Sequence, residues 1–260
     1  MRKSTITVGI IARNEEANIG ECIQRVMGWA DEVVVIDGYS QDRTVEIARR
    51  MGANVFQHKF QEDFSIERNM VMDNATGDWV LHLDADDRVT EGFKKRFNTI
   101  ADHSSDLDVL KFRRKNFFLG RFMKHGGWYH YIPNLVRRGK VRFEGALHER
   151  PVYVGKIGIL DEDVEHHPFQ TISKFVYRHN RYSSIEAENM YSKEGKAKLD
   201  QVKKQAVRKT LKIFWKTYVK KKGYKEGMHG LVFAVLFSFT NFLIWAKYWE
   251  LCRKDSYPNT

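Results

Sequence analysis

The feature that most constrains the fold is a regular alternation of strand and helix signals across the first ninety residues. Apolar runs rich in β-branched residues, typical of buried strands, occupy residues 6–11, 32–36, 53–57 and 78–83. Between them lie three segments with helical spacing of apolar residues, at 14–28, 44–51 and 63–73. Strands and helices that alternate in this way predict a parallel sheet with both faces covered.

Acid-bearing loops follow three of these strands, at residues 14–16, 37–42 and 84–87. In a parallel sheet the carboxyl ends of the strands meet at one edge, and ligands bind beyond that edge. We therefore expect the three loops to line a single site. Asn14 is also expected to cap the helix that follows the first strand.

The strongest local signal is Asp84-Ala85-Asp86, which places two carboxylates one residue apart directly after a buried strand. Such hard oxygen ligands suit Mg²⁺ or Mn²⁺, and a metal held there can grip a diphosphate as it leaves. With Asp87, three acids arrive at one place, and a cation would relieve their repulsion. Two acids in a loop are commonly just solvated, so the prediction depends on the strand before them.

Two further residues are candidates for binding a nucleotide. Asp37 stands in the same relation to its strand and could accept a hydrogen bond from a base N–H; alternatively, with Ser40 and Asp42, it caps the next helix. Arg68, on a helix between two strands, could reach a phosphate or could be an ordinary surface residue.

The second half of the chain offers a general base and further metal ligands. Glu149 is the best candidate for taking a proton from an acceptor hydroxyl, although a lone glutamate in a loop usually faces solvent. His148, His166 and His167 could each supply a third metal ligand, against the commoner structural role of histidine.

The organisation changes after the first hundred residues. Short β-type runs separated by glycine turns fill residues 107–159 and are expected to build an acceptor side; helical spacing follows Pro168. We predict a first domain at 1–168 and a helical region at 169–260. Cys22, on an apolar helix stripe, is expected to be buried, and nothing demands an oxidising compartment.

Positive charge is concentrated in one segment. Residues 196–225 carry twelve Lys or Arg and one acid, Asp200, so this segment alone carries the net charge of +11. An uncharged stretch of 17 residues, 230–246, follows it, somewhat short of the roughly 20 residues that span a bilayer. This order favours association with anionic lipid headgroups, while a solvated basic face and a buried core helix remain alternatives. The N-terminal apolar run is too short for a signal peptide, which predicts a cytoplasmic protein on the inner face of the membrane.

Three segments, at 6–16, 30–44 and 76–87, together resemble the family 2 glycosyltransferases. The nearest subgroup is the β-1,4-glucosyltransferase-like enzymes of the lipopolysaccharide core, and weaker similarity continues through 126–129, 147–149 and 178–182. The resemblance implies an α/β GT-A fold, with a Rossmann-like, mostly parallel sheet and a C-terminal helical appendage. It also implies an inverting reaction and a divalent metal, Mn²⁺ or Mg²⁺.

The resemblance also implies a role for particular residues. Asp86 would bind the metal directly, Asp84 would face the ribose and the metal, and Glu149 would be the base. The residues expected to contact the nucleotide sugar are Ala12, Arg13, Asn14, Glu16, Asp37, Arg68, Asp84 and Ala85. Gly38, Tyr39 and Asp87 depart from the usual family residues.

Together these features predict transfer of a sugar, glucose from UDP-glucose by resemblance, onto lipopolysaccharide core or another lipid-linked glycan. A sugar nucleotidyltransferase is disfavoured because the first loop, 13–16, has no glycine. A membrane-surface adaptor that has lost catalysis is disfavoured by the retained acids. Nucleic-acid binding through 196–225 lacks an accompanying recognition motif.

Overall fold

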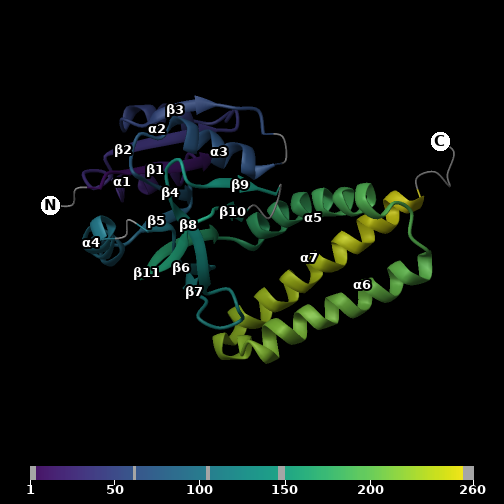
Figure 1. The fold of residues 1–260 in the computed structure, drawn as a ribbon. Coiled ribbons are helices and arrows are strands. Elements are labelled where there is room, and N and C mark those ends of the chain that lie inside the picture. The colour runs from purple at the N-terminus through teal and green to yellow at the C-terminus, as the bar shows by residue number, and fades with distance from the viewer. Residues whose placement is uncertain (1–3, 61–62, 104–105, 146–149, 254–260) are drawn as a thin grey trace. The chain divides into compact units, whose positions relative to one another are not determined.

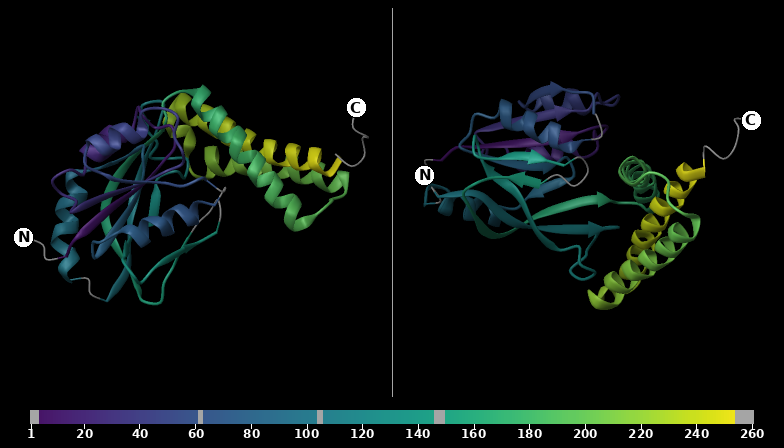
Figure 2. Two further views of the ribbon diagram at one scale, coloured as in Figure 1. Left: turned by 90° about the horizontal axis from the view of Figure 1, so that it is seen from above. Right: turned by 45° about the vertical axis from the view of Figure 1, so that its right-hand side comes forward.

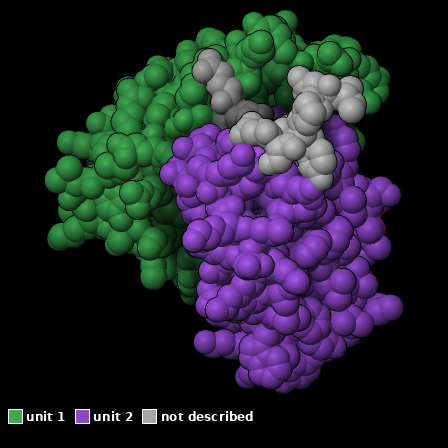
Figure 3. Space-filling model, turned by 90° about the vertical axis from the view of Figure 1, so that its right-hand side faces the viewer, with its two compact units in different colours: residues 1–115, 130–166 green, residues 116–129, 167–260 purple. Residues whose placement is uncertain are grey.

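The computed structural model describes residues 4–60, 63–103, 106–145 and 150–253. The chain forms two compact units, coloured separately in Figure 3. The first comprises residues 1–115 and 130–166, and the second comprises residues 116–129 and 167–260. The domain boundary predicted after residue 168 stays a prediction. In the structure the segment 116–129 belongs to the same unit as the C-terminal helices.

A mixed β-sheet is the framework of the first unit, and Figure 1 shows its strands. Its order is β3-β2-β1-β4-β8-β6-β11-β5, with β7 beside β6, and β9 pairs with β10 in a separate ribbon. The strands are β1 (Ile6–Ala12), β2 (Glu32–Asp37), β3 (Asn54–Gln57), β4 (Trp79–Asp84), β5 (Asp87–Val89), β6 (Leu107–Phe118), β7 (Arg121–Phe122), β8 (His130–Arg137), β9 (Arg142–Glu144), β10 (Arg150–Val152) and β11 (Lys156–Phe169). The first four strands are parallel, as predicted, whereas β8 pairs antiparallel with β4 and β6.

The sheet buries an apolar core on each face, because its central strands are apolar on both sides. Alternate residues of β1, including Ile6, Val8 and Ile10, pack with helices α1 (Ile19–Gln24), α2 (Thr44–Arg50) and α4 (Glu91–Ile100). The opposite face, including Val34 and Val80, packs with α3 (Phe64–Asn74). Cys22 is fully buried in the first of these cores, as expected. This two-sided burial holds the carboxyl ends of β1, β2 and β4 at one edge.

The role predicted for Asn14 as a helix cap is wrong. Helix α1 begins at Ile19, and Asn18 occupies its N-cap position. Asn14 has a φ of 54° and lies in the turn after β1, where its side-chain oxygen accepts a hydrogen bond from the Gln41 N–H at 2.8 Å. Asparagine tolerates this left-handed conformation better than most residues, which suits it to a tight turn.

The short β-type runs expected at 107–159 are partly wrong, because β6 is long and the long strand β11 begins at Lys156, whereas β7 to β10 are short as expected. β6 is 12 residues long and β11 is 14 residues long. The glycines at which turns were expected lie outside the strands, whereas Gly158 lies within β11, where a side chain would overlap Leu107. Glycine in a strand often marks such a close approach.

The second unit is dominated by three helices, α5 (Ile172–Glu194), α6 (Leu199–Phe214) and α7 (Gly227–Arg253). Single turns at Ala101–His103 in the first unit, and at Trp215–Lys220 and Gly223–Glu226 in the second, complete the helical elements. Helix α7 packs against both α5 and α6. One apolar cluster joins Val202 and Ala206 of α6 to Trp245 and Tyr248 of α7. The helical character predicted after Pro168 is therefore confirmed, and α6 coincides with the basic segment.

Substitution of Gly9 tests how tightly β1 packs against α3. A methyl group added at Gly9 would overlap Cγ1 of Val71. We expect Gly9→Ala to lower the free energy of unfolding by about 1–3 kcal/mol, measured by urea denaturation, because this core has no room for it. Gly20→Ala, whose added methyl group would lie 3.4 Å from Ile47, is the control and should cost much less. Equal losses in the two variants would contradict this packing, and Val71→Ala should partly rescue the Gly9 variant.

Candidate active site

The candidate site forms where β1, β2 and β4 end side by side. In the parallel ladders Ala12 of β1 lies opposite Asp37 of β2, and Ile11 lies opposite Asp84 of β4. A tight turn, Ala85-Asp86, then joins β4 to the short strand β5. The acid-bearing loops therefore meet at one edge of the sheet, as the strand pattern predicts.

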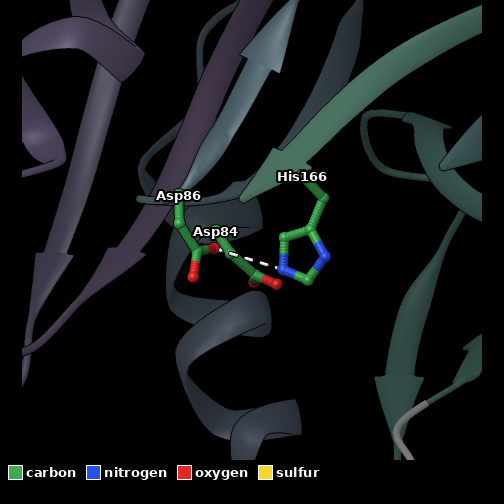
Figure 4. Close-up of side chains that lie close together, drawn as sticks. All are labelled: Asp84, Asp86 and His166. Carbon is green, nitrogen blue, oxygen red and sulfur yellow. Dashed lines mark ion pairs between the residues drawn. The ribbon is translucent and has the colours of Figure 1, made fainter. Parts of the chain in front are cut away.

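His166 joins this edge from a distant part of the chain. In the antiparallel pairing of β5 with β11, His166 lies opposite Asp87. Its Nε2 is 3.3 Å from Oδ1 of Asp86, and Figure 4 shows the ring facing the carboxylates of Asp84 and Asp86. One ligand atom from each of these three residues lies within 4.8 Å of the others. We name Asp84, Asp86 and His166 the carboxylate–imidazole cluster.

The donor set of this cluster fits a divalent cation. Two carboxylates and an imidazole suit Mn²⁺, which accepts oxygen and nitrogen ligands, and Mg²⁺ would use the oxygens. Asp86 is almost completely buried, so its charge needs a close positive partner. Of the three histidines considered as a third ligand, the structure brings His166 to the acids. His167 instead stacks on Phe117 with ring centroids 4.3 Å apart, and His148 lies outside the described residues.

Arginines surround the same acids. Arg114 of β6 binds Asp84 through Nη2 and also contacts both carboxylate oxygens of Asp87, at 2.8 and 2.9 Å. Arg68 of α3 approaches Asp84 from the other side, with 3.8 Å between Nη2 and Oδ1. Arg88 donates to the backbone oxygen of Ala85 at 3.0 Å. Part of the repulsion expected among the acids is therefore relieved by the protein's own cations.

The pKa values of the two acids that Arg114 binds shift in opposite directions. Burial acts to raise the pKa of Asp84, but the charges of Arg114 and Arg68 outweigh it and lower this pKa to about 2. Burial raises the pKa of Asp87 above its ordinary value despite the neighbouring Arg114. Asp84 is thus fully ionised at neutral pH, which is the form that can bind a metal.

The first two loops are tied together by hydrogen bonds. The Asn14 N–H donates to Oγ of Ser40 at 2.8 Å, and the Glu16 N–H donates to Asp42 at 3.0 Å. Asp37 is completely buried and accepts from Ser40 and from Gln57, so it braces its loop rather than capping α2. These contacts build a rigid frame in the place where the nucleoside was predicted to bind.

The remaining predicted residues have varied environments. Ala12 and Ala85 are buried and can offer only backbone groups. Arg13 is exposed and lies over Gly38, and Glu16 pairs with Arg43 at 3.2 Å. Arg68 is buried beside Asp84, so its reading as an ordinary surface residue is wrong. Glu149, the predicted base, lies outside the described residues.

Sequence reasoning missed Arg114 and Arg88. Arg114 was detectable, because the even-numbered residues around it, Phe112, Asn116 and Phe118, alternate as the buried face of a strand. An arginine in such a row requires an acidic partner. Arg88 had no comparable signal, since its partner Glu21, at 3.0 Å, comes from a separate helix.

Comparison with known proteins assigns the family. The model of the glycosyl transferase family 2 matches residues 7–153, more than half of the chain. The chain belongs to this family. It is a glycosyltransferase, and the predicted α/β fold of the GT-A type is confirmed. The matched range contains Asp84 and Asp86 but ends before His166 and the three long helices.

Several relatives share this assignment. An uncharacterized glycosyltransferase of Rickettsia typhi is 27% identical over 96% of this chain and 88% of its own length. The prophage-derived glycosyltransferase SunS of Bacillus subtilis is 30% identical over 70% of this chain and 41% of its own. Glucosyl-3-phosphoglycerate synthase of Mycobacterium tuberculosis, solved with Mn²⁺, UDP and phosphoglyceric acid, aligns over 44% of each chain at 23% identity and a TM-score of 0.38. The aligned region spans under half the length of that enzyme.

Metal binding tests the carboxylate–imidazole cluster. Asp86→Asn and His166→Gln should each weaken Mn²⁺ binding at least about tenfold, because each removes one ligand atom from the cluster. Isothermal titration with Mn²⁺ measures this directly. Glu165→Gln is the matched control, since Glu165 is next in sequence but pairs with Lys115 at 3.0 Å. Unchanged affinity in both cluster variants would place the metal elsewhere.

Proposed function

We propose that this glycosyltransferase is an inverting, metal-dependent enzyme that transfers glucose from UDP-glucose to a lipid-linked glycan such as lipopolysaccharide core. The observation that carries the proposal is the carboxylate–imidazole cluster at the end of β4, whose two carboxylates lie within the family 2 match. The choice of glucose, UDP and lipopolysaccharide rests on the sequence resemblance to core glucosyltransferases.

The donor would lie across the ends of β1, β2 and β4. The loops at Asn14 and Asp37, joined by hydrogen bonds through Ser40, would hold the nucleoside. Asp84, Asp86 and His166 would hold Mn²⁺ or Mg²⁺, which would neutralise charge developing on the diphosphate. Arg68 and Arg114 add positive charge at the same edge, and they also keep Asp84 ionised.

The reaction would be a single displacement. Glu149 would remove the proton from an acceptor hydroxyl, and the hydroxyl oxygen would form a bond to the anomeric carbon. The bond from that carbon to the diphosphate oxygen breaks at the same time, and UDP leaves with the electron pair. Attack from the face opposite the leaving group inverts the configuration.

The acceptor suggests a location for the enzyme. A lipid-linked acceptor lies at a membrane, and the basic segment 196–225 with the apolar helix after it supports peripheral association with an anionic surface. By length and composition, Gly223–Arg253 could also cross a bilayer. We place the enzyme on the cytoplasmic face of the inner membrane, where nucleotide sugars are available.

Donor hydrolysis tests the reaction class. Purified protein given a panel of nucleotide sugars should release UDP from UDP-glucose in the presence of Mn²⁺, and removal of the metal with EDTA should abolish release. Liberated UDP is measured by a coupled assay. No release from any donor, combined with no UDP binding by calorimetry, would contradict the proposal and favour the adaptor.

Glu149 is tested separately. Glu149→Gln should lower transfer to the acceptor by about 10²–10⁴-fold, because the amide cannot take the hydroxyl proton. UDP binding should be unchanged, since the base is not proposed to contact the nucleotide. Glu144→Gln, an exposed change on the nearby strand β9, is the control. Full transfer activity in Glu149→Gln would assign the base elsewhere.

A further inference from the structure

Helix α7 carries an exposed apolar stripe. Its members are separated by three or four residues and are 37 to 71% exposed: Met228, Leu231, Val235, Phe239 and Phe242. The stripe is about 21 Å long at 1.5 Å per residue. No charged residue interrupts positions 230–246. A row of this size on a helix that already packs on its other side indicates a binding surface.

Helix α6 and the first residue of the turn that follows it carry a second stripe of the same kind. Val207, Leu211 and Trp215 recur every four residues and are 51 to 63% exposed. Exposed basic residues, Lys204 and Arg208 among them, lie beside this stripe. The combination of apolar and cationic side chains on one exposed helix face is typical of helices that bind at a membrane surface.

The two stripes face the same side of the second unit. Helices α6 and α7 lie side by side and run antiparallel (Figures 1 and 2). Exposed residues directly follow buried ones in both helices: Val207 follows Ala206, and Val235 follows Ala234. Viewed from one end, two antiparallel helices turn in opposite senses. Residues that come directly after the buried residues of each helix therefore lie on the same side of the helix pair. We name the eight residues of both stripes the α6–α7 apolar face.

The charge of the same helices indicates what this face binds. The segment that contains α6 carries the whole net charge of +11. Anionic lipids attract such a segment through their headgroups while the bilayer accepts the apolar side chains. A nucleic acid would use the charge alone and leave the apolar residues exposed.

Contacts on the other side of α7 favour a helix that lies on the bilayer surface over a helix that crosses the bilayer. Lys247 donates hydrogen bonds to Oγ of Ser183 and Ser184 on α5, at 2.9 and 2.8 Å. Lys209 of α6 lies over the ring of Trp245, 4.5 Å from its centre. A crossing helix would have to leave these partners or draw the charged helices into hydrocarbon, and both are costly.

We propose that the α6–α7 apolar face docks flat on an anionic bilayer, with its apolar side chains in the boundary between headgroups and acyl chains. The inference rests on the membrane association proposed above and defines the residues that make it. Docking by this face would hold the transferase at the surface where a lipid-linked acceptor is exposed.

Vesicle flotation of the full chain tests the docking face. Wild-type protein should float with phosphatidylcholine vesicles containing about 30% phosphatidylglycerol, and high salt should weaken this binding. Replacing Trp215, Val235 and Phe239 together by Gln should weaken binding at least tenfold. The matched control replaces three exposed apolar residues of α5, Ile172, Val176 and Tyr177, by Gln and should bind like wild type. Circular dichroism melting verifies that each variant is folded.

A fluorophore on Val235→Cys distinguishes the two membrane orientations, because both natural cysteines are buried. Quenching by lipids brominated at different depths should place it near the headgroup boundary. A position at the bilayer centre would overturn flat docking, as would equal binding by the α6–α7 variant and wild type. Failure to bind vesicles, with salt-sensitive binding to duplex DNA instead, would also overturn it.

Donor hydrolysis in the same samples should be unchanged by the α6–α7 substitutions, so loss of the proposed reaction and loss of docking are separate results.

Discussion

Repulsion among Asp84, Asp86 and Asp87 is the constraint on which the architecture of this transferase depends. Three carboxylates that leave one strand end within four residues need polar or positive partners, and the protein supplies such partners from different elements. Arg114 comes from β6, Arg68 from α3, and His166 from β11. The arginines engage Asp84 and Asp87, whereas Asp86 faces the imidazole. The protein's own cations therefore offset part of the charge of these acids, and the cluster also offers a ligand set for a metal.

The sheet fixes the positions of the side chains that surround these acids. Short strand β5 follows the acidic turn at once and pairs with β11, and that pairing fixes His166 opposite Asp87. Neighbouring β1 aligns the ends of β2 and β4, so the nucleoside frame around Asp37 and the acids around Asp84 share an edge. Buried cores on both faces of the sheet make this edge rigid, as a preorganised site requires.

The first half of the fold was predictable because its signals are local. Apolar runs and helical spacing located β1 to β4 and α2 and α3 within a residue or two. The site was predictable to the extent that its residues follow strands, as Asp37 and Asp84 do. His166 could be named as a candidate ligand but not placed beside the acids, because the antiparallel pairing of β5 with β11 joins residues about eighty positions apart and leaves no local pattern. Asn14 was misassigned as a cap because the sequence does not reveal that its backbone turns left-handed.

We propose that Asp84, Asp86 and His166 hold the metal that binds the donor diphosphate. A crystal structure of the transferase with Mn²⁺ and UDP, with anomalous data collected at the manganese edge, tests this role of the carboxylate–imidazole cluster. We expect one anomalous peak between these three side chains, with the diphosphate oxygens completing the coordination and the uracil beside Asp37. UDP bound at this edge with no peak, or a manganese ion held by other residues, would show that the cluster is not the metal site.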